Sequence, residues 1–360
     1  MQGIFWNYFI KFKIVIMKII TIANNIEGNI DGIGKHARLL AEEFKKQGHS
    51  VTLVSAKSGM NKWLSLISLK MSIVFLRAIY LLLKQHYDVL TIEYPFREHN
   101  PIIILFHIVL YFIAKGRSTV VAFSMHEYDR VFILRRRIID VFLHFSDVIF
   151  VSEEKYIKRF TTHQHKMFLR TIPNHIVCDK TNKLCNKNEF CYFGLISKAK
   201  AFSEMISAWE VFNSDNHARL HIISSSDIPH DILLPKSIDY HYDMSMEDAV
   251  EIMFNCAFSI VPVLPDIGLN NSSFVSSIQS GCIPIGKFSN ELLNKDFIIN
   301  CPSYELKDFV SALNTASKLS EDDFYTMSKK CVDFGKNFSI GKTAKQMIDG
   351  FKINVSNQHL

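Results

Sequence analysis

The sequence has no pair of cysteines at the CxxC spacing that zinc sites and redox motifs use. Its seven cysteines are an odd number and lie scattered along 360 residues. This pattern argues against a disulfide framework or a structural zinc site, and it fits a reducing compartment. We interpret the cysteines as small residues of buried apolar layers.

The chain also lacks zinc-finger spacing and any alternation of basic and aromatic residues, so we expect no nucleic-acid partner. Its net charge of +6 is unevenly divided. Residues 1–180 carry 25 Lys and Arg against 14 Asp and Glu, whereas residues 181–360 carry 16 against 21. The basic half suits contact with an anionic membrane surface, because its basic residues are interleaved with long aliphatic runs.

The N-terminal segment 1–16 has no A-x-A cleavage site, and Lys11 and Lys13 interrupt its apolar run. It is therefore a poor signal peptide. We interpret Met17 as the true start, because a strand at 18–23 follows it directly. The alternative is a short extension that lies on a membrane. We expect a cytoplasmic protein at the inner face of the cell membrane.

No repeat or low-complexity tract is present, and short apolar strands alternate with amphipathic helices. This alternation predicts an α/β fold with parallel sheets that helices cover on both faces. The first half predicts a helix at 34–47 and strands at 18–23, 51–55, 88–92, 118–123, 147–151 and 168–172. The second half predicts helices at 202–213, 246–255, 272–280 and 340–352, and strands at 189–194, 219–224, 238–242, 257–263 and 282–286.

The polar segment 177–188 has no periodicity and is interpreted as a linker. We therefore expect two Rossmann-like domains, at 17–176 and 187–340, and a helix at 341–356 that returns to the first domain. The two domains are expected to face each other across a cleft, at the carboxyl ends of their strands, where ligands bind in such folds.

Two segments, 64–83 and 101–114, are unusually apolar. Lys70 and Arg77 interrupt the first segment, and the second is too short to cross a bilayer. We interpret both as helices buried on the first sheet. The alternative, which is compatible with the first, is that they also lie in the membrane interface, aided by the arginines at 135–137.

Two polar motifs stand at strand ends in the first half. Gly32 and Gly34 precede the helix at 34–47, where glycines let backbone N–H groups approach a phosphate or a sugar hydroxyl. Glycine turns also serve as plain connections. His126 follows the strand at 118–123, where it can hydrogen-bond a sugar hydroxyl or stabilise charge, although a lone histidine is often structural.

The second half carries two further motifs. Gly194 ends a strand, and Lys198 and Lys200 follow on the loop, where their ammonium groups could stabilise a diphosphate or simply be solvated. Another cluster precedes the helix at 272–280 and consists of Asn270, Asn271, Ser272 and Ser273. It could cap that helix or leave N–H groups for an anion.

Together these motifs resemble glycosyltransferase family 4 and its GT-B relatives, over nearly the whole chain from Met17. The opening GIGKHARLLAEEFKKQGHSVTLVS is similar to the glycine turn, helix and strand of that family. Three further stretches follow in the order of the family: SDVIFVSEEKYIKRF with Ile172-Pro173-Asn174-His175, FGLISKAKAFSEMISAWEVF, and SMEDAVEIMFNCAFSIVPVLP with SSIQSGCIPIG.

The resemblance implies transfer of a sugar from a nucleotide-diphosphate sugar, with retention of configuration, without a metal ion and without a bound cofactor. It implies catalytic roles for His126 and Lys200. The implied donor-phosphate contacts are Lys200, Asn271, Ser272 and Ser273, and our hypothesis is that Lys198 substitutes for an arginine of the family that this chain lacks. The implied sugar or acceptor contacts are Gly32, Gly34, His126 and Asn270.

The chain departs from the family at several positions. Leu195 stands where an arginine is expected, and Ala201 where a glycine is expected. The carboxylate pair spaced eight residues apart is missing, because Gly268 and Ser276 occupy its positions, although Asp266 could take over one role. These departures leave open a catalytically silent GT-B partner subunit. A sugar-nucleotide epimerase is the other alternative.

The basic, apolar first half predicts a membrane-bound acceptor. We expect a lipid-linked oligosaccharide in the assembly of a surface polysaccharide such as an O-antigen or a capsule, with peripheral contact to the membrane. No carboxylate pair of the hydrolase kind is evident. The sequence leaves the donor sugar and its base open.

Overall fold

The computed structural model describes residues 16–23, 32–55, 70–94, 102–126, 128, 133–170, 186–197 and 199–358. The expectations about residues 1–15, the junction at 172–175 and Lys198 lie outside these residues. The chain divides into two compact units. Unit 1 is Met1–Leu169 with Gln346–Leu360, and unit 2 is Arg170–Lys345.

Unit 1 contains a six-stranded parallel sheet in the order β2-β1-β3-β4-β5-β6. Its strands are β1 Lys18–Ala23, β2 Ser50–Ser55, β3 Val89–Tyr94, β4 Val120–Met125, β5 Val148–Val151 and β6 Met167–Leu169. Its helices are α1 Gly32–Lys46, α3 Lys70–Lys84, α4 Ile102–Gly116, α5 Ile133–His144, α6 Glu154–Arg159 and the 3-10 helix η1 Thr161–Lys166.

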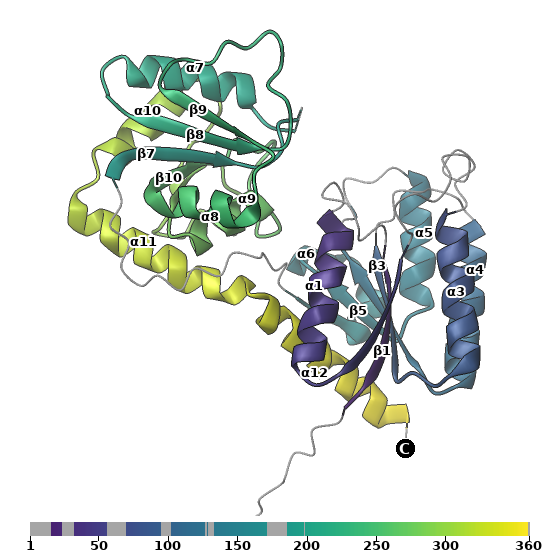
Figure 1. Ribbon diagram of the computed structural model, residues 1–360. Coiled ribbons are helices and arrows are strands. Elements are labelled where there is room, and N and C mark those ends of the chain that lie inside the picture. Colours follow the sequence, from purple (N-terminus) through teal and green to yellow (C-terminus); the bar gives the residue numbers. More distant parts are fainter. Residues whose placement is uncertain are drawn as a thin grey trace, which may run out of the picture. The chain divides into compact units, whose positions relative to one another are not determined.

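Helices cover both faces of this sheet (Figure 1). Helix α1 and the end of the C-terminal helix lie on one face, and α3, α4 and α5 lie on the other. Strands β3, β4 and β5 are therefore buried along their whole length. This explains why their sequences are nearly continuous apolar runs and do not alternate.

Unit 2 contains a second six-stranded parallel sheet, in the order β12-β11-β10-β7-β8-β9. Its strands are β7 Asn186–Phe193, β8 Arg219–Ser224, β9 Ile238–Tyr242, β10 Cys256–Ile260, β11 Ile283–Gly286 and β12 Ile299–Asn300. Its helices are α7 Phe202–Asn213, α8 Met246–Asn255, α9 Ser272–Gln279, α10 Leu306–Ser317, α11 Glu321–Gly335 and the 3-10 helix η2 Lys336–Phe338. Helices α7 and α10 lie on one face of the sheet, and α8 and α9 lie on the other (Figure 1).

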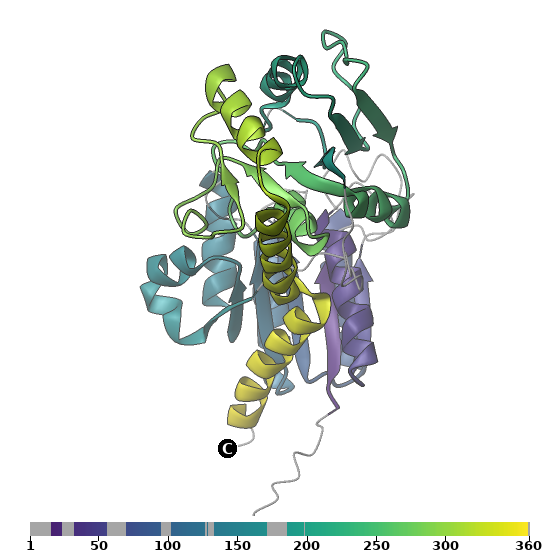
Figure 2. The same ribbon diagram turned by 90° about the vertical axis from the view of Figure 1, so that its left-hand side faces the viewer.

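The last helix, α12 Ile340–Gln358, begins in unit 2 and ends in unit 1. Its final turns lie against the sheet of unit 1 (Figure 2). Phe351 is fully buried there, with its ring centroid 5.5 Å from that of Phe150 and 6.1 Å from that of Phe44. A Cβ on Gly350 would lie 3.0 Å from the Phe150 ring, so the helix approaches β5 closely. The predicted return of the C-terminal helix to the first domain is confirmed.

Two predicted boundaries are wrong. The expected linker at 177–188 is too long, because Asn186 already begins β7; residues 177–185 lie outside the described part. Helix α1 begins at Gly32, so Gly32 and Gly34 stand in its first turn and not in a loop before it. The candidate ligand-binding position at these glycines is therefore the start of a helix and not a turn.

The described parts of the two apolar segments lie in α3 and α4, each 15 residues long, whereas residues 64–69 and 101 lie outside the described part of the chain. None of the described helices is both long enough and apolar enough to cross a membrane. The five cysteines at described positions form no disulfide with one another and are buried, as the sequence predicted: Cys191, Cys256, Cys282, Cys301 and Cys331.

Candidate functional site

The first cluster of polar groups lies in unit 1, where parallel strands end at one edge of the sheet. Glu93 stands near the end of β3, and His126 directly follows β4. The His126 Nε2 atom lies 2.8 Å from the Glu93 Oε2 atom, and both side chains are buried. Because Nε2 faces a carboxylate, this ring nitrogen donates, and a neutral imidazole then has Nδ1 as its proton acceptor.

His36, in the first turns of α1, joins this pair. Its ring packs edge-on against His126, with centroids 5.2 Å apart, and it is 6% exposed. One ligand atom from each of His36, Glu93 and His126 lies within 4.8 Å of the others. Two imidazoles and a carboxylate are donors that zinc or iron accepts, so these residues could hold a metal ion. The same arrangement also suits a carboxylate that orients a histidine toward a hydroxyl group.

The second cluster lies in unit 2, directly after β7. Gly194 has a φ of +138°, and a Cβ at this position would lie 2.7 Å from the Ser273 Oγ atom and 3.5 Å from the Lys200 Nζ atom. Both the backbone angle and the crowding therefore require glycine. Lys200 Nζ donates to Ser273 Oγ at 3.3 Å, so the strand end, the loop and helix α9 meet at one ammonium group.

Backbone hydrogen bonds fix the loop that carries Lys200. The N–H of Ala201 donates to the carbonyl of Pro262 at 2.8 Å, and the N–H of Leu264 donates to the carbonyl of Ala199 at 2.9 Å. These bonds attach the loop to the chain that follows β10. The backbone at Lys200 is thus held beside the chain that follows β10, and the ammonium contacts Ser273 from there.

The electrostatics at Lys200 favour an anion. Burial lowers the pKa of Lys200 to about 8. No carboxylate within the described part of the chain forms a salt bridge with it, and its other near neighbour is the Tyr192 ring, with the ammonium 5.7 Å from the centroid. A half-buried cation without a counter-ion is costly, and a bound anion would relieve that cost.

The start of α9 has the capping role that the sequence suggested for it. Asn271 caps the helix, because its side-chain oxygen accepts from the N–H of Phe274 at 2.9 Å. The Asn271 N–H donates to the carbonyl of Gly268, so it is not available to a phosphate, contrary to the role expected for it. Ser273, in the first turn, contacts Lys200 directly. Ser272 precedes it at the first position of the helix.

A carboxylate lies beside the Gly268 position, although none stands at that position in the sequence. The Glu291 Oε1 atom accepts from the N–H of Leu269 at 3.2 Å, and it lies 3.4 Å from where a Cβ on Gly268 would be. The Asn270 side-chain oxygen lies on the same side, 3.3 Å from that Cβ position. Ser276, at the other position of the missing pair, is fully buried in α9.

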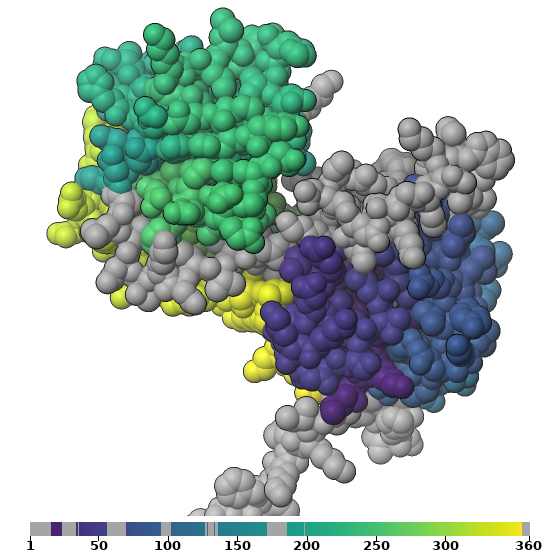
Figure 3. Space-filling view, in the orientation of Figure 1, coloured from purple at the N-terminus to yellow at the C-terminus, as the bar shows by residue number. Residues whose placement is uncertain are grey.

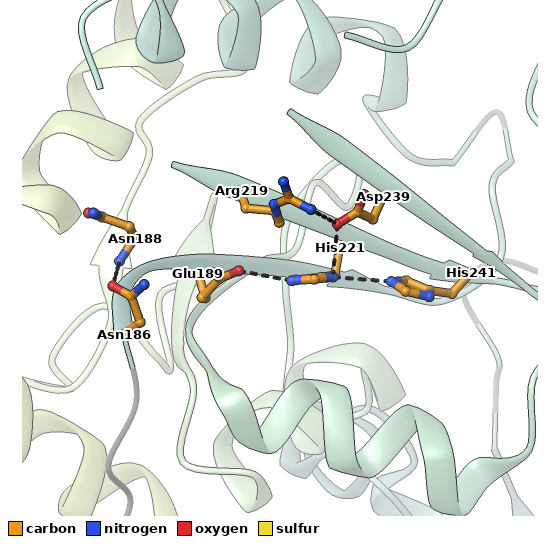
Figure 4. Close-up of polar contacts among 7 residues, drawn as sticks. All are labelled: Asn186, Asn188, Glu189, Arg219, His221, Asp239 and His241. Carbon is orange, nitrogen blue, oxygen red and sulfur yellow. Dashed lines mark hydrogen bonds and ion pairs between the residues drawn. The ribbon is translucent and has the colours of Figure 1, made fainter. Parts of the chain in front are cut away.

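A third polar cluster crosses strands β7, β8 and β9, toward the β9 edge of the sheet in unit 2 (Figure 4). His221 lies between Glu189 and His241, with its Nε2 2.9 Å from the Glu189 carboxylate and its Nδ1 3.1 Å from the His241 Nε2. Arg219 donates to Asp239 at 2.8 Å beside it. Burial and the neighbouring His221 lower the pKa of His241. These are cross-strand pairs that fix the register of the sheet.

The structure thus brings together Lys200 and Ser273 in unit 2, with Asn270, Asn271 and Ser272 on the adjoining turn. In unit 1 it places His126 near α1, whose first turn holds Gly32 and Gly34. Sequence reasoning missed Glu93 and Glu291 and gave His36 no role. A lone carboxylate inside the apolar strand sequence VLTIEY was a usable signal for Glu93, whereas no spacing links Glu291 to Gly268.

Several solved structures share this fold at low sequence identity. The structure of Anabaena HepE in complex with UDP and glucose has a TM-score of 0.66 and 10% identity, and the alignment covers 94% of this chain and 100% of that chain. An alpha-glucosyltransferase in complex with UDP and a 13-mer DNA containing an HMU base has a TM-score of 0.66 and 17% identity, with the same coverage. No family model and no curated protein matches the chain. The predicted fold class, α/β with two Rossmann-like units of the GT-B kind, is confirmed.

Proposed function

We propose that the protein is a glycosyltransferase that takes a sugar from a nucleotide-diphosphate sugar and transfers it to a glycan acceptor. The observation that carries the proposal is the Lys200 ammonium, which is half-buried, held beside Gly194 and Ser273, and without a carboxylate partner in the described chain. HepE and the alpha-glucosyltransferase were both solved with UDP, so a UDP-sugar is the first donor to test.

The proposed reaction rests on stabilising the charge of the leaving group. As the bond between the sugar and the diphosphate breaks, negative charge grows on the phosphate oxygens, and Lys200 with the start of α9 stabilises it. The acceptor hydroxyl attacks the anomeric carbon on the face that the diphosphate leaves, which retains the configuration, and its proton passes to the departing phosphate oxygen as the bond between sugar and diphosphate breaks. Positioning supplies the remainder of the rate. We propose that this chemistry uses neither a metal ion nor a resident cofactor.

In this proposal unit 1 binds the acceptor. His126 is oriented by Glu93 and is the proposed partner of a sugar hydroxyl, and the start of α1 at Gly32 and Gly34 contributes the positive end of a helix dipole. In unit 2, Asn270 is the proposed contact of the sugar that the donor carries. We propose a lipid-linked oligosaccharide as the acceptor, at the inner face of the cell membrane, in surface polysaccharide assembly. The basic, apolar character of unit 1 supports this acceptor class.

One solved relative of the fold is bound to DNA, which makes DNA a second acceptor to test. The proposal favours the lipid-linked glycan because the exposed helices of unit 1 carry apolar side chains, which phosphate backbones do not contact.

The test is a binding titration of UDP, other nucleoside diphosphates and their sugars, followed by thermal unfolding of the purified chain. Lys200→Ala should weaken binding of the preferred nucleotide by about 10- to 100-fold, because a hydrogen bond to a charged group contributes about 1.5–3 kcal/mol. Wild-type affinity should fall as the pH rises through about 8, since the anion binds the protonated amine. Lys200→Arg should flatten this pH dependence.

The matched control is Lys307→Ala, an exposed lysine on α10 of the same unit, which should bind as the wild type does. If no nucleotide binds to the folded wild-type chain, the donor proposal is wrong and the silent partner subunit takes its place. If a nucleotide-sugar binds but is converted without any acceptor, the epimerase takes its place.

A further inference from the structure

The outer faces of α3 and α4 are apolar over three turns each. The two helices pack side by side on the same face of the sheet of unit 1 (Figure 1). On each helix, large apolar side chains are exposed at the spacing i, i+3, i+7, i+10. On α3 these are Ile73, Leu76, Tyr80 and Leu83, and on α4 they are Ile102, Leu105, Val109 and Phe112. We call these eight residues the α3–α4 face; the atoms of both helices lie at the surface of unit 1 (Figure 3).

This face is additional to the core. The opposite side of α3 buries Val74, Phe75, Ala78 and Leu82, and the opposite side of α4 buries Ile103, Leu110 and Ala114. Each helix is therefore apolar on two sides, although a surface helix of a globular protein normally carries polar residues outward. Phe112 is 62% exposed and Leu105 is 59% exposed, so neither side chain is part of the core between the helices and the sheet. Two adjacent helices that both expose large apolar side chains on their outer sides indicate a binding surface.

The charges around the α3–α4 face indicate the class of surface that it binds. Neither helix contains an Asp or Glu, and residues 44–87 contain none either. Arg77 and Lys84 are exposed on α3, and Lys115 ends α4, where it also pairs with Asp147 at 3.0 Å. A second copy of the chain would bring these cations against each other without an acidic partner on the patch. An anionic lipid surface supplies both the apolar phase and the negative charge.

We infer that the α3–α4 face docks on an anionic lipid bilayer, with both helices lying in the interface. The aromatic rings of Tyr80 and Phe112 enter the boundary between headgroups and acyl chains, and Arg77 and Lys84 extend to the phosphates. This inference deepens the proposed function. It rests on that function only for the purpose of the docking, which is access to a lipid-linked acceptor. The docking itself is a property of unit 1 and does not require that the chain transfers a sugar.

The experiment is co-sedimentation of the full-length chain with vesicles of phosphatidylcholine alone or with phosphatidylglycerol added. The wild type should bind the anionic vesicles at low salt, and bind them less well at high salt. The double variant Leu105→Glu/Phe112→Glu should lower the partition coefficient by at least about tenfold, because it places two charges in the apolar interface. Both positions are exposed, so thermal unfolding should be unchanged.

The matched control is Val211→Glu/Leu306→Glu, which replaces two apolar residues of similar exposure on α7 and α10 of unit 2. It should bind vesicles as the wild type does. The charge variant Arg77→Gln/Lys84→Gln should weaken binding to anionic vesicles and remove most of its salt dependence.

The inference is wrong if the wild type does not bind anionic vesicles at low salt, or if Leu105→Glu/Phe112→Glu binds them as well as the wild type does. It is also wrong if this variant keeps its vesicle binding and instead loses self-association or the binding of duplex DNA. A nucleotide titration on the same samples separates the two proposals. A chain that binds UDP but no vesicles overturns only the docking, and a chain that binds vesicles but no nucleotide overturns only the proposed function.

Discussion

Gly194 shows how much a single residue decides in unit 2. Its positive φ turns the chain out of β7, and its missing side chain leaves the space in which Lys200 and Ser273 meet. Any other residue would strain the backbone and push into the Ser273 hydroxyl. The candidate donor site therefore depends on a position with no functional group of its own.

This dependence can be measured with two glycines. Gly194→Ala should cost about 1–3 kcal/mol of stability from backbone strain and should also weaken nucleotide binding. Gly48→Ala carries the same kind of strain at a φ of +91°, but no atom lies within 4 Å of the new Cβ. It should destabilise the chain while leaving the nucleotide affinity unchanged. Equal affinities for Gly194→Ala and the wild type, by titration, would show that the crowding at Ser273 does not matter.

At the residue scale, positions that follow a strand could be placed from the sequence. Gly194 and His126 directly follow strands and Lys200 lies on the loop after β7, and strand ends of a parallel sheet are where side chains meet. Sequence reasoning missed Glu93 and Glu291, because their partners are 33 and 22 residues away in the chain. Contacts of that range are set by tertiary packing, and no local spacing encodes them.

At the scale of elements, the buried side of α4 carries an unusual group. His107 is fully buried in this helix, stacks on Phe142 with centroids 4.0 Å apart, and hydrogen-bonds the Phe145 carbonyl at 2.9 Å. Because that partner is a carbonyl oxygen, the Nε2 atom must donate. Burial lowers the pKa of His107 to about 3. The helix thus contains a histidine that must stay neutral.

We expect this histidine to make folding sensitive to acid. Its pKa is lower in the folded chain than in the unfolded chain, so the unfolded state takes up the extra proton. The stability is fully present above about pH 6.5 and falls by about 1.4 kcal/mol per unit as the pH drops toward 3. His107→Gln keeps a hydrogen-bond donor for the Phe145 carbonyl. It should lower the slope of the unfolding free energy against pH by the amount that corresponds to one proton taken up on unfolding. Denaturant unfolding at pH 7, 6 and 5 measures the slope, and the exposed His217→Gln is the control.

Elements with strong patterns were predictable and others were not. The helix at 202–213 and the strands at 219–224 and 238–242 match the structure residue for residue. The strand expected at 257–263 ends at Ile260, because the chain there turns toward the Lys200 loop. Helices α10 and α11 were not predicted, although Phe309, Ala312, Leu313 and Ala316 bury one helical face at the expected spacing.

At the scale of the whole molecule, unit 1 depends on α12. Phe351→Ala should destabilise unit 1 by about 3–5 kcal/mol, because it empties a buried aromatic site between Phe44 and Phe150. Hydrogen exchange should show lost protection in α1 and β5, with unit 2 unchanged. The control Ile353→Ala, on the exposed side of the same helix, should change stability by less than about 0.5 kcal/mol. Uniform loss of protection in both units would show that they unfold together.

The order in which a ribosome makes this chain gives α12 a further consequence. Unit 2 is continuous from Arg170 to Lys345, whereas unit 1 needs residues from both sides of it. During synthesis the sheet of unit 1 emerges first, yet the helix that covers Phe44 and Phe150 emerges after the whole of unit 2. Unit 1 therefore emerges first and is completed last. Until α12 covers them, Phe44 and Phe150 form an exposed aromatic surface on the nascent chain, to which a chaperone can bind.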